Sequence, residues 1–532
     1  MNKKIISGAF WLSFGSIVSR ILGVVYLIPW LIMIGSAANQ TSAQALFNSS
    51  YQIYAMFISL GTAGFPSAVA RRVAMYNGEQ KFLNSRKIAR TGFAVMVLSG
   101  VLCGIVMYVI APILAKSSPV VSATAATKSI RLLVPAIVIL PSMSFIRGWF
   151  QGNEDMQPYG MSQLWEQLLR IIFILGSTYV IIYILHLNFV IAVYSSILGA
   201  FIGAIASYLY LGNWFRKKMP EYSQRYRQSK PLDLTSIRKM FMMIIYESVP
   251  FVFVGSGITL TQLIDQFFFK QVMQGFLHNS AVYTQYIYTL FSANPTKITT
   301  VVLSLALAVA ETSLPLLSKA RVSDQGNISK LISENLNLLL FVLLPVIAIL
   351  GALSAEIYGI FFNFDELGGI YLLENLIQAL IMGLAINGLT LLQSLRYSKK
   401  AVQYLLIGLA IKLVIQFPCV YYFEGFGGII ATAIAFLAVV ILCYSKLHWT
   451  FNVRFAILDR TEFTNILFFL FTIAMYFGVR SFYVPSTKLT AFIYCAVFSI
   501  IQAVVYVWIG NKMGASRRIF GRDLSLAMVT HR

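Results

Sequence analysis

Long apolar runs follow one another along almost the whole chain, separated by short polar stretches. The first run covers residues 7–34 and is interrupted by one full charge, Arg20. A helix needs about 20 apolar residues to cross a bilayer core, so runs of this length can span a membrane. We count fourteen spans, which begin near residues 7, 43, 88, 128, 160, 189, 240, 283, 330, 370, 400, 427, 462 and 489. The pattern predicts an all-α polytopic membrane protein with about 14 transmembrane helices.

Composition supports this fold class. Of the 532 residues, 58% are hydrophobic and 11% are charged, and the mean hydropathy is +0.76. A soluble globular chain does not carry so apolar a composition. The four cysteines lie in apolar runs without CxxC spacing, which favours packing over disulfide or zinc binding. Two small-residue spacings, Gly100-x3-Gly104 and Gly199-x3-Gly203, likewise predict close helix packing.

The distribution of lysine and arginine predicts the orientation in the membrane. An even number of spans places both termini on one side. The opposite side then holds only five basic residues, whereas most others, Arg147 among them, fall on the side of the termini. Those five are Lys116, Lys128, Arg131, Arg480 and Lys488. Because cytoplasmic loops are enriched in lysine and arginine, both termini are predicted to be cytoplasmic. This orientation and anionic lipid headgroups account for the net charge of +22, so no nucleic-acid partner is expected.

A weak internal repeat predicts two lobes. Residues 150–172 correspond to residues 392–414, which places Arg170 opposite Lys412. Six spans separate the copies, so the two halves have the same orientation, and such lobes typically enclose a central site between them. We therefore predict a six-helix lobe at 1–215, a basic cytoplasmic linker at 216–239, a second six-helix lobe at 240–455, and helices 13 and 14 with a basic tail at 456–532.

Nine charged residues fall inside the predicted spans. The basic ones are Arg20, Arg170, Lys270, Lys297 and Lys412, and the acidic ones are Glu166, Glu247, Asp265 and Glu311. A charge near the bilayer centre costs about 2.5–3.5 kcal/mol on insertion scales, so it normally faces a bundle interior or an aqueous cavity. Glu247 and Glu311 lie near helix ends, where water reaches them. The deeper charges lean basic, which favours an anionic substrate, and the predicted substrate-binding residues are Arg20, Lys297, Arg170, Lys412, Glu166 and Asp265.

Alternative roles remain open for these residues. Glu166 and Arg170 are spaced i, i+4 and can form an ion pair, which is either structural or part of the site. Arg20 could also extend toward the interface or pair with a carboxylate. Asp265 could pair with an arginine of the other lobe. Lys297 follows Asn294-Pro295, where the missing proline N–H predicts a kink, and a kinked helix with a deep lysine is typical of a transport site.

The sequence shows no arrangement of residues typical of an enzyme active site. It has no metal-ligand spacing, no phosphate-cradling glycine loop and no large soluble domain. No cofactor or metal is expected, and coupling to the membrane potential, H⁺ or Na⁺ stays open. The expected partners are a lipid-linked anionic oligosaccharide and membrane lipids. The chain is expected to act as a monomer and to meet the cell-wall synthesis machinery.

Four stretches resemble a known family: residues 7–30, 51–77, 147–170 and 426–436. The sequence looks like the polysaccharide-transporter branch of the multidrug/oligosaccharidyl-lipid/polysaccharide (MOP) exporter superfamily. Within that branch it resembles the Gram-positive YtgP/SpoVB group, whose members are similar to the lipid II flippase MurJ. The element SQLWEQLLR, at 162–170, is the most specific part of the resemblance.

The resemblance implies a fourteen-helix flippase in the bacterial cytoplasmic membrane. Its cargo would be an undecaprenyl-diphosphate-linked sugar, and lipid II, the precursor for peptidoglycan synthesis, is the first candidate. Arg20, in SRILG, matches a cavity arginine of the MurJ family, but Tyr26 and Leu27 stand where that family has an Arg-Asp pair. The alternatives are a teichoic-acid, capsule or exopolysaccharide unit as cargo, and a cation-coupled drug exporter. A membrane glycosyltransferase or polymerase is disfavoured because catalytic constellations are missing from the sequence.

Overall fold

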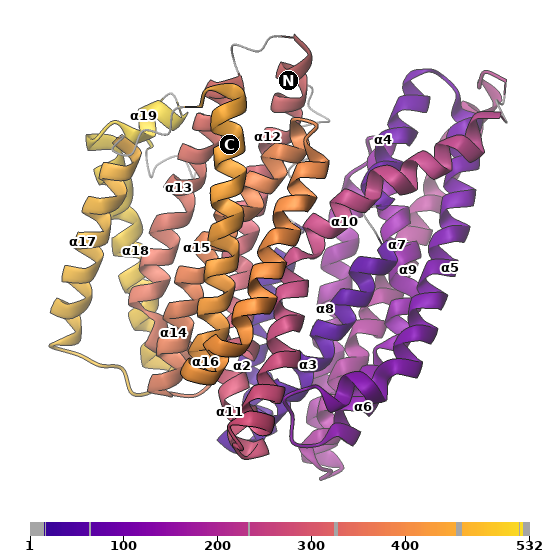
Figure 1. The fold of residues 1–532 in the computed structure, drawn as a ribbon. Coiled ribbons are helices and arrows are strands. Elements are labelled where there is room, and N and C mark those ends of the chain that lie inside the picture. Colours follow the sequence, from indigo (N-terminus) through magenta and orange to yellow (C-terminus); the bar gives the residue numbers. More distant parts are fainter. Residues whose placement is uncertain are drawn as a thin grey trace. The chain divides into compact units, whose positions relative to one another are not determined.

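The computed structural model describes most of the chain. The described residues are 15, 18–62, 65–231, 235–323, 328–453, 460–520 and 522–524, with the side chains of 65–68, 71, 235–251, 311–316, 318–323 and 520 left out. They form two compact units, which meet in sequence between Tyr288 and Thr289. Each unit is all helical in the part of the chain described (Figure 1).

The first unit begins with a helix at Val18–Ile34, whose second part is α2 (Leu27–Ile34). It continues with α3 (Ala37–Thr62), α4 (Phe65–Gly78), α5 (Phe82–Lys116), α6 (Ala123–Leu132), α7 (Val134–Gly152), α8 (Gln157–Tyr179) with the π-helical turn η1 (Val180–Ile184), α9 (Phe189–Arg227), α10 (Thr235–Lys270) with the π-helical turn η2 (Gln271–Phe276), and α11 (Ala281–Tyr288).

The second unit begins at a break in a membrane-length helix. A π-helical turn, η3 (Thr289–Ala293), is followed by the turn residue Asn294 and then by α12 (Pro295–Ser323). The predicted kink at Asn294-Pro295 is confirmed. Further elements are α13 (Ile328–Ala352), α14 (Ser354–Phe361), α15 (Glu366–Ser394), α16 (Ser398–Phe451), α17 (Arg460–Arg480), α18 (Lys488–Lys512) and α19 (Ala515–Phe520).

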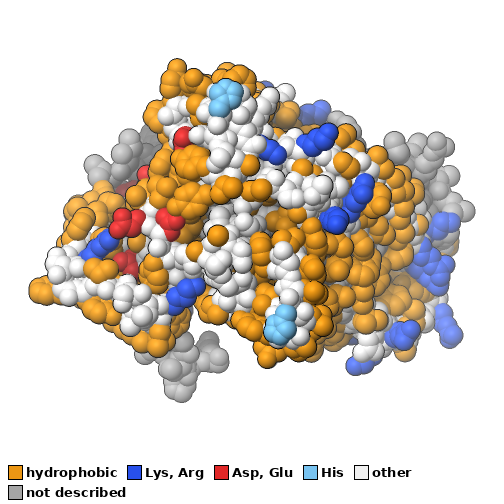
Figure 2. All heavy atoms as spheres, turned by 90° about the horizontal axis from the view of Figure 1, so that it is seen from below, with side chains coloured by type: hydrophobic (Ala, Val, Ile, Leu, Met, Phe, Trp, Pro, Cys, Tyr) orange, Lys and Arg blue, Asp and Glu red, His pale blue; other side chains and the backbone are white. Residues whose placement is uncertain are grey.

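Eleven helices in the described residues are long and apolar enough to cross a membrane. Helices also occupy the three other predicted places. The Val18–Ile34 helix is shorter than the eleven, and α3 is long enough but too polar to be counted as a membrane span. The third place lies within α16, which contains two helices joined at Glu424, where φ of 50° and ψ of −123° are non-helical. Apolar side chains cover much of the visible surface in Figure 2, as expected for a chain that faces lipid. The predicted fold class is confirmed.

The predicted linker overlaps the ends of two helices. Residues 216–227 continue α9 to Arg227, residues 228–231 form a turn and coil, and residues 235–239 open α10. The predicted lobe boundaries and the repeat stay predictions.

Candidate functional site

Helix α8 carries Ser162, Glu166 and Arg170 at intervals of four residues, so their side chains lie along one face. Arg170 Nη2 contacts Glu166 Oε1 at 2.8 Å. The predicted pair therefore forms in the first unit. The Arg170 side chain is 18% exposed and that of Glu166 is 15% exposed, so the pair is largely withdrawn from the surface.

Arg147, on α7, completes this group. Its Nη2 donates to Glu166 Oε2 at 2.9 Å and to Ser207 Oγ on α9, also at 2.9 Å. Its Nε donates to Ser162 Oγ at 2.8 Å. The sequence reasoning counted Arg147 among the basic residues on the side of the termini and not among the charges inside spans, whereas the structure shows it 8% exposed within a membrane-length helical segment. The side chain is satisfied because two other helices, α8 and α9, supply its acceptors.

One carboxylate thus holds two guanidinium groups, Arg147 and Arg170, in the core of the first unit. Two arginines and one glutamate give this trio, Arg147, Glu166 and Arg170, a formal net charge of one positive unit. Removing charges from water is costly unless they are paired and hydrogen-bonded, which the two ion pairs and two serine contacts provide. The remaining positive charge would attract an anion.

Three tyrosines of the first unit, Tyr26, Tyr51 and Tyr54, lie within electrostatic range of the Arg170 guanidinium. An aromatic ladder places Tyr51: its ring stacks on Phe47 with centroids 4.4 Å apart, and it meets the Tyr54 ring edge-on at 5.3 Å. Tyr51 Oη and Arg170 Nε are buried, and neither has a hydrogen-bond partner among the described residues.

The helix that carries Arg20 packs against α8. A Cβ at Gly15 would meet the Gly160 carbonyl oxygen at 2.7 Å, and one at Gly23 would meet Gln167 Nε2 at 3.1 Å. Arg20 is half-buried and has an interaction within the protein. The structure therefore places the helices of Arg20 and of the Glu166–Arg170 pair side by side.

Asp265 lies elsewhere in the first unit, on α10, and is 8% exposed. Its neighbour Gln266 belongs to a polar seam between α3 and the segment α10–α11 that the sequence reasoning missed. Gln266 Nε2 donates to the Ser49 carbonyl at 3.2 Å and to Ser118 Oγ at 3.0 Å. Tyr288 Oη accepts from Asn48 at 3.3 Å and donates to Gln52 Oε1 at 3.2 Å.

A sequence signal for this seam exists. Gln40, Gln44, Asn48 and Gln52 recur every four residues along α3 and are all buried. A stripe of amides at helical spacing in a predicted span indicates a face turned toward the protein interior, since lipid cannot satisfy these groups.

The two predicted lysines lie in the second unit. Lys297 is half-buried in the first turn of α12, directly after the η3 break. Lys412 is fully buried in α16 and donates to the Thr432 hydroxyl in the other half of that helix pair. The side chains of Glu247 and Glu311 are not among those that the structure describes.

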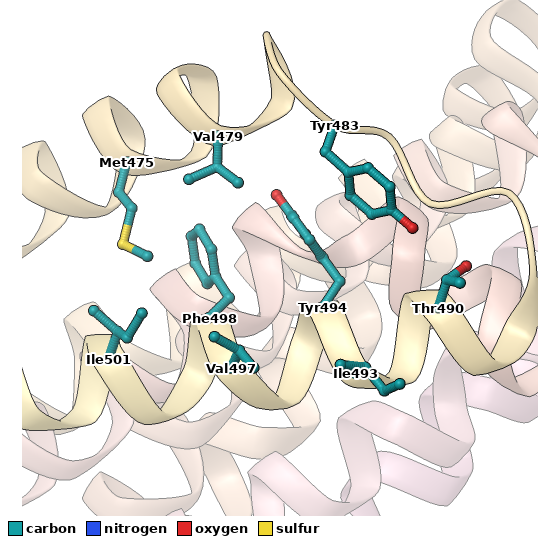
Figure 3. Close-up of a pocket in the computed structure, with 9 residues that line it drawn as sticks. All are labelled: Met475, Val479, Tyr483, Thr490, Ile493, Tyr494, Val497, Phe498 and Ile501. Atoms are coloured by element: carbon teal, nitrogen blue, oxygen red, sulfur yellow. The ribbon is translucent and has the colours of Figure 1, made fainter.

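A cavity of about 470 Å³ lies between α17 and α18. Figure 3 shows Met475 and Val479 from α17 facing Tyr494, Val497 and Phe498 from α18. Its lining contains no charged side chain among the described residues, so it is separate in character from the predicted anion site.

Comparison with known proteins assigns the family. A family model described as "Polysaccharide biosynthesis protein" matches residues 5–321, which is more than half of the chain. The chain belongs to this family. The trio on α7 and α8 and its tyrosines lie within the matched residues.

Relatives extend the family match over the whole chain. The chain is 30% identical to "Lipid II flippase MurJ" of Bacillus subtilis over 98% of both proteins. It is also 25% identical to "Stage V sporulation protein B" of the same organism, over 47% of this chain and 46% of that protein. These matches confirm the predicted resemblance to the MOP exporter superfamily.

A solved structure shows the family fold. The structure titled "Lipid II flippase MurJ, inward closed conformation" aligns with 96% of this chain and 99% of its own, with a TM-score of 0.60 and 15% sequence identity. At that identity the match supports the fold alone, which is that of a multi-pass helical membrane protein.

Proposed function

We propose that this chain is a flippase, not an enzyme, which moves an undecaprenyl-diphosphate-linked cell-wall precursor from the cytoplasmic to the outer leaflet. Lipid II, for peptidoglycan synthesis, is the first candidate cargo. The observation that carries the proposal is the full-length similarity to a lipid II flippase, at 30% identity over 98% of both chains. The buried positive charge of the first unit supports it, because the diphosphate is anionic.

The proposed mechanism is alternating access between the lobes at 1–215 and 240–455, in a bacterial cytoplasmic membrane with both termini inside. Arg20, Arg170, Lys297 and Lys412 would supply positive charge along the path of the cargo, with Glu166 and Asp265 tuning it. Coupling to the membrane potential, H⁺ or Na⁺ would drive transport, since one charge moved across 100 mV is worth about 2.3 kcal/mol.

Another lipid-linked oligosaccharide is the second candidate cargo. Tyr26 favours it, because this tyrosine, within electrostatic range of Arg170, stands where the resemblance to the MurJ family implies an arginine. A cation-coupled drug exporter is disfavoured, since the trio of Arg147, Glu166 and Arg170 leaves excess positive charge rather than an acidic cavity.

Complementation tests the proposal. In a strain depleted of its lipid II flippase, expression of this chain should restore growth and restore lipid II to the outer leaflet, measured with a membrane-impermeant enzyme that cleaves it. Growth without outward lipid II would point to another cargo. Failure of a normally expressed chain on both readouts would refute a role in lipid II transport.

Arg20 variants connect the function to the predicted site. Arg20→Ala should abolish rescue at normal protein level, and Arg20→Lys should retain part of it, because lysine keeps the charge but lacks the planar fork of donors. Arg131→Ala is the control, since Arg131 lies over the Tyr108 ring on α5 at 4.4 Å, away from the trio. Full rescue by Arg20→Ala would exclude a role for Arg20 in cargo binding.

A further inference from the structure

Several buried hydrogen-bond donors of the first unit have no partner among the described residues. Two of them belong to the charged group described above: Tyr51 Oη on α3 and Arg170 Nε on α8. Burying an unsatisfied donor is unfavourable, so each such group in a native fold calls for a specific explanation. The Tyr51 hydroxyl lies within electrostatic range of the Arg170 guanidinium, so the two unpartnered donors belong to one region of the first unit.

The chemistry of that acceptor follows from the surrounding charge. Arg170 interacts with Glu166 and with the hydroxyls of Tyr26, Tyr51 and Tyr54. Glu166 is shared with Arg147, so this carboxylate does not neutralise both guanidinium groups. Unpartnered arginine N–H and tyrosine O–H donors in a region with uncompensated positive charge suit an oxyanion.

The site is also preorganised. Glu166 fixes one edge of the Arg170 guanidinium at 2.8 Å, and Arg147 fixes Glu166 at 2.9 Å while it bonds Ser162 and Ser207. Phe47 and Tyr54 hold the Tyr51 ring between them. Donors that are already oriented need little ordering when a ligand binds, which raises affinity.

We propose that Arg170 and Tyr51 bind an oxyanion of the cargo, a phosphate or a carboxylate, and that Arg147 and Glu166 are positioning residues for Arg170. The inference rests on the proposed function, because a lipid-linked precursor supplies both kinds of oxyanion. It adds Tyr51 and Arg147 as residues that determine recognition of the anionic part of the cargo.

Tyr51→Phe gives the sharpest test. The substitution removes one oxygen that has no partner among the described residues, so a purely structural role predicts unchanged or higher thermal stability. Binding is measured with the purified full-length protein by native mass spectrometry, using lipid II, undecaprenyl diphosphate and uncharged undecaprenol as probes. Tyr51→Phe should weaken binding of lipid II about tenfold, which corresponds to one lost hydrogen bond to a charged group, and leave undecaprenol binding unchanged.

The probes separate the two sources of the oxyanion. Weaker binding of both lipid II and undecaprenyl diphosphate assigns a phosphate, whereas weaker binding of lipid II alone assigns a carboxylate of its glycopeptide. Tyr494→Phe is the matched control, because the Tyr494 hydroxyl is also buried without a partner among the described residues but lies in the second unit. It should leave the binding of all three probes unchanged.

Arg147→Lys tests the positioning role. Lysine keeps the positive charge but cannot reproduce the forked contacts to Ser162, Glu166 and Ser207. Affinity for the anionic probe that responds to Tyr51→Phe should fall several-fold, while undecaprenol binding, which a general structural defect would also lower, should not change. Equal loss for the charged and uncharged probes would overturn the positioning role.

The remaining outcomes separate the two proposals. If the wild-type protein binds lipid II and Tyr51→Phe binds it equally well, the oxyanion site is wrong and the flippase proposal stands. If the wild-type protein binds neither anionic probe, both proposals are overturned.

Discussion

Glu166 occupies an unusual electrostatic position, because two arginines from different helices share its two oxygens inside a membrane-embedded bundle. The three side chains are only 10–18% exposed, so each charge depends on the others for stabilisation. Removing one member of a buried ionic group leaves the rest uncompensated, which typically costs about 3–5 kcal/mol, whereas exposed ion pairs contribute about 0–1 kcal/mol.

The first prediction therefore concerns Glu166→Gln. It keeps the size of the side chain and removes the charge that holds Arg147 and Arg170 together, so unfolding in mixed detergent micelles should become easier by about 3–5 kcal/mol. Glu221→Gln is the matched control, since Glu221 also bridges two cations, Lys218 and Arg225, but its side chain is 45% exposed. That variant should change stability by less than about 1 kcal/mol.

A charge swap tests the third member of the group. If Glu166 and Arg170 formed an isolated pair, Glu166→Arg combined with Arg170→Glu would restore the interaction. Arg147 approaches position 166 at 2.9 Å, so an arginine there would face like charge. The swapped protein should remain at least as unstable as Glu166→Gln in the same unfolding assay, and recovery of wild-type stability would contradict the three-residue arrangement.

At the residue scale, sequence reasoning succeeded where the partners were local. The Glu166–Arg170 contact follows from i, i+4 spacing on one helix. The part that Arg147 plays in this group was missed because its acceptors, Ser162, Glu166 and Ser207, come from other helices, and tertiary contacts of this kind leave no periodic signal. The roles of Asp265, Lys297 and Lys412 in binding stay predictions.

Among the helices, α8 and α9 pack closely because glycines remove side chains at the contact. A Cβ at Gly203 would meet the Glu166 carbonyl oxygen at 2.5 Å, and one at Gly199 would meet Ile174 at 2.8 Å. The predicted packing role of the Gly199-x3-Gly203 spacing is thus confirmed. The same contact fixes the backbone that carries Glu166.

Two substitutions on α9 should have opposite effects. Gly203→Ala would push α8 away at Glu166 and should destabilise the protein by about 1–3 kcal/mol. Gly212→Ala places its Cβ where no heavy atom lies within 4 Å, so it should stabilise the helix by about 0.5–1 kcal/mol. Both are measured by unfolding in mixed micelles. Equal effects would mean that the helix contact at Gly203 is looser than the structure indicates.

The polar seam of α3 gives a second prediction at this scale. Gln266 is fully buried, and its amide joins α10 to Ser49 and Ser118. Gln266→Leu would leave these acceptors unpaired and should cost about 1–3 kcal/mol of stability in the same assay. Gln228→Leu, at an exposed position after α9, should have little effect. A neutral result for Gln266→Leu would show that water or neighbouring groups replace the amide.

Most helices could be predicted because apolar length is a strong signal for a membrane span. Even α16, a continuous helical assignment of 54 residues, was predicted as two spans, and the structure breaks it at Glu424. The π-helical turns were not predicted, although Pro295 marks the end of one of them. A π-turn depends on the packing around a helix, and sequence periodicity does not report that packing.

At the scale of the whole molecule, the direction of transport depends on how the protein is oriented in the membrane. Helix α9 offers a test within one element. One end carries Arg216, Lys217 and Lys218 in the helix and Arg225 and Arg227 in its last turn, while the other end begins at Phe189 without a charge in its first turn. The positive-inside rule predicts that the basic end is cytoplasmic.

Single cysteines at the two ends of α9 should therefore label differently. In a background with Cys103, Cys419, Cys443 and Cys495 replaced by serine, Leu187→Cys should react with a membrane-impermeant maleimide on intact cells, and Gln228→Cys should react only after permeabilisation. Both positions are exposed, so burial does not explain a difference. Labelling in lysed cells checks that both thiols are reactive. The reverse pattern would place the termini outside, and the proposed outward direction of transport would then lose its basis in the charge distribution.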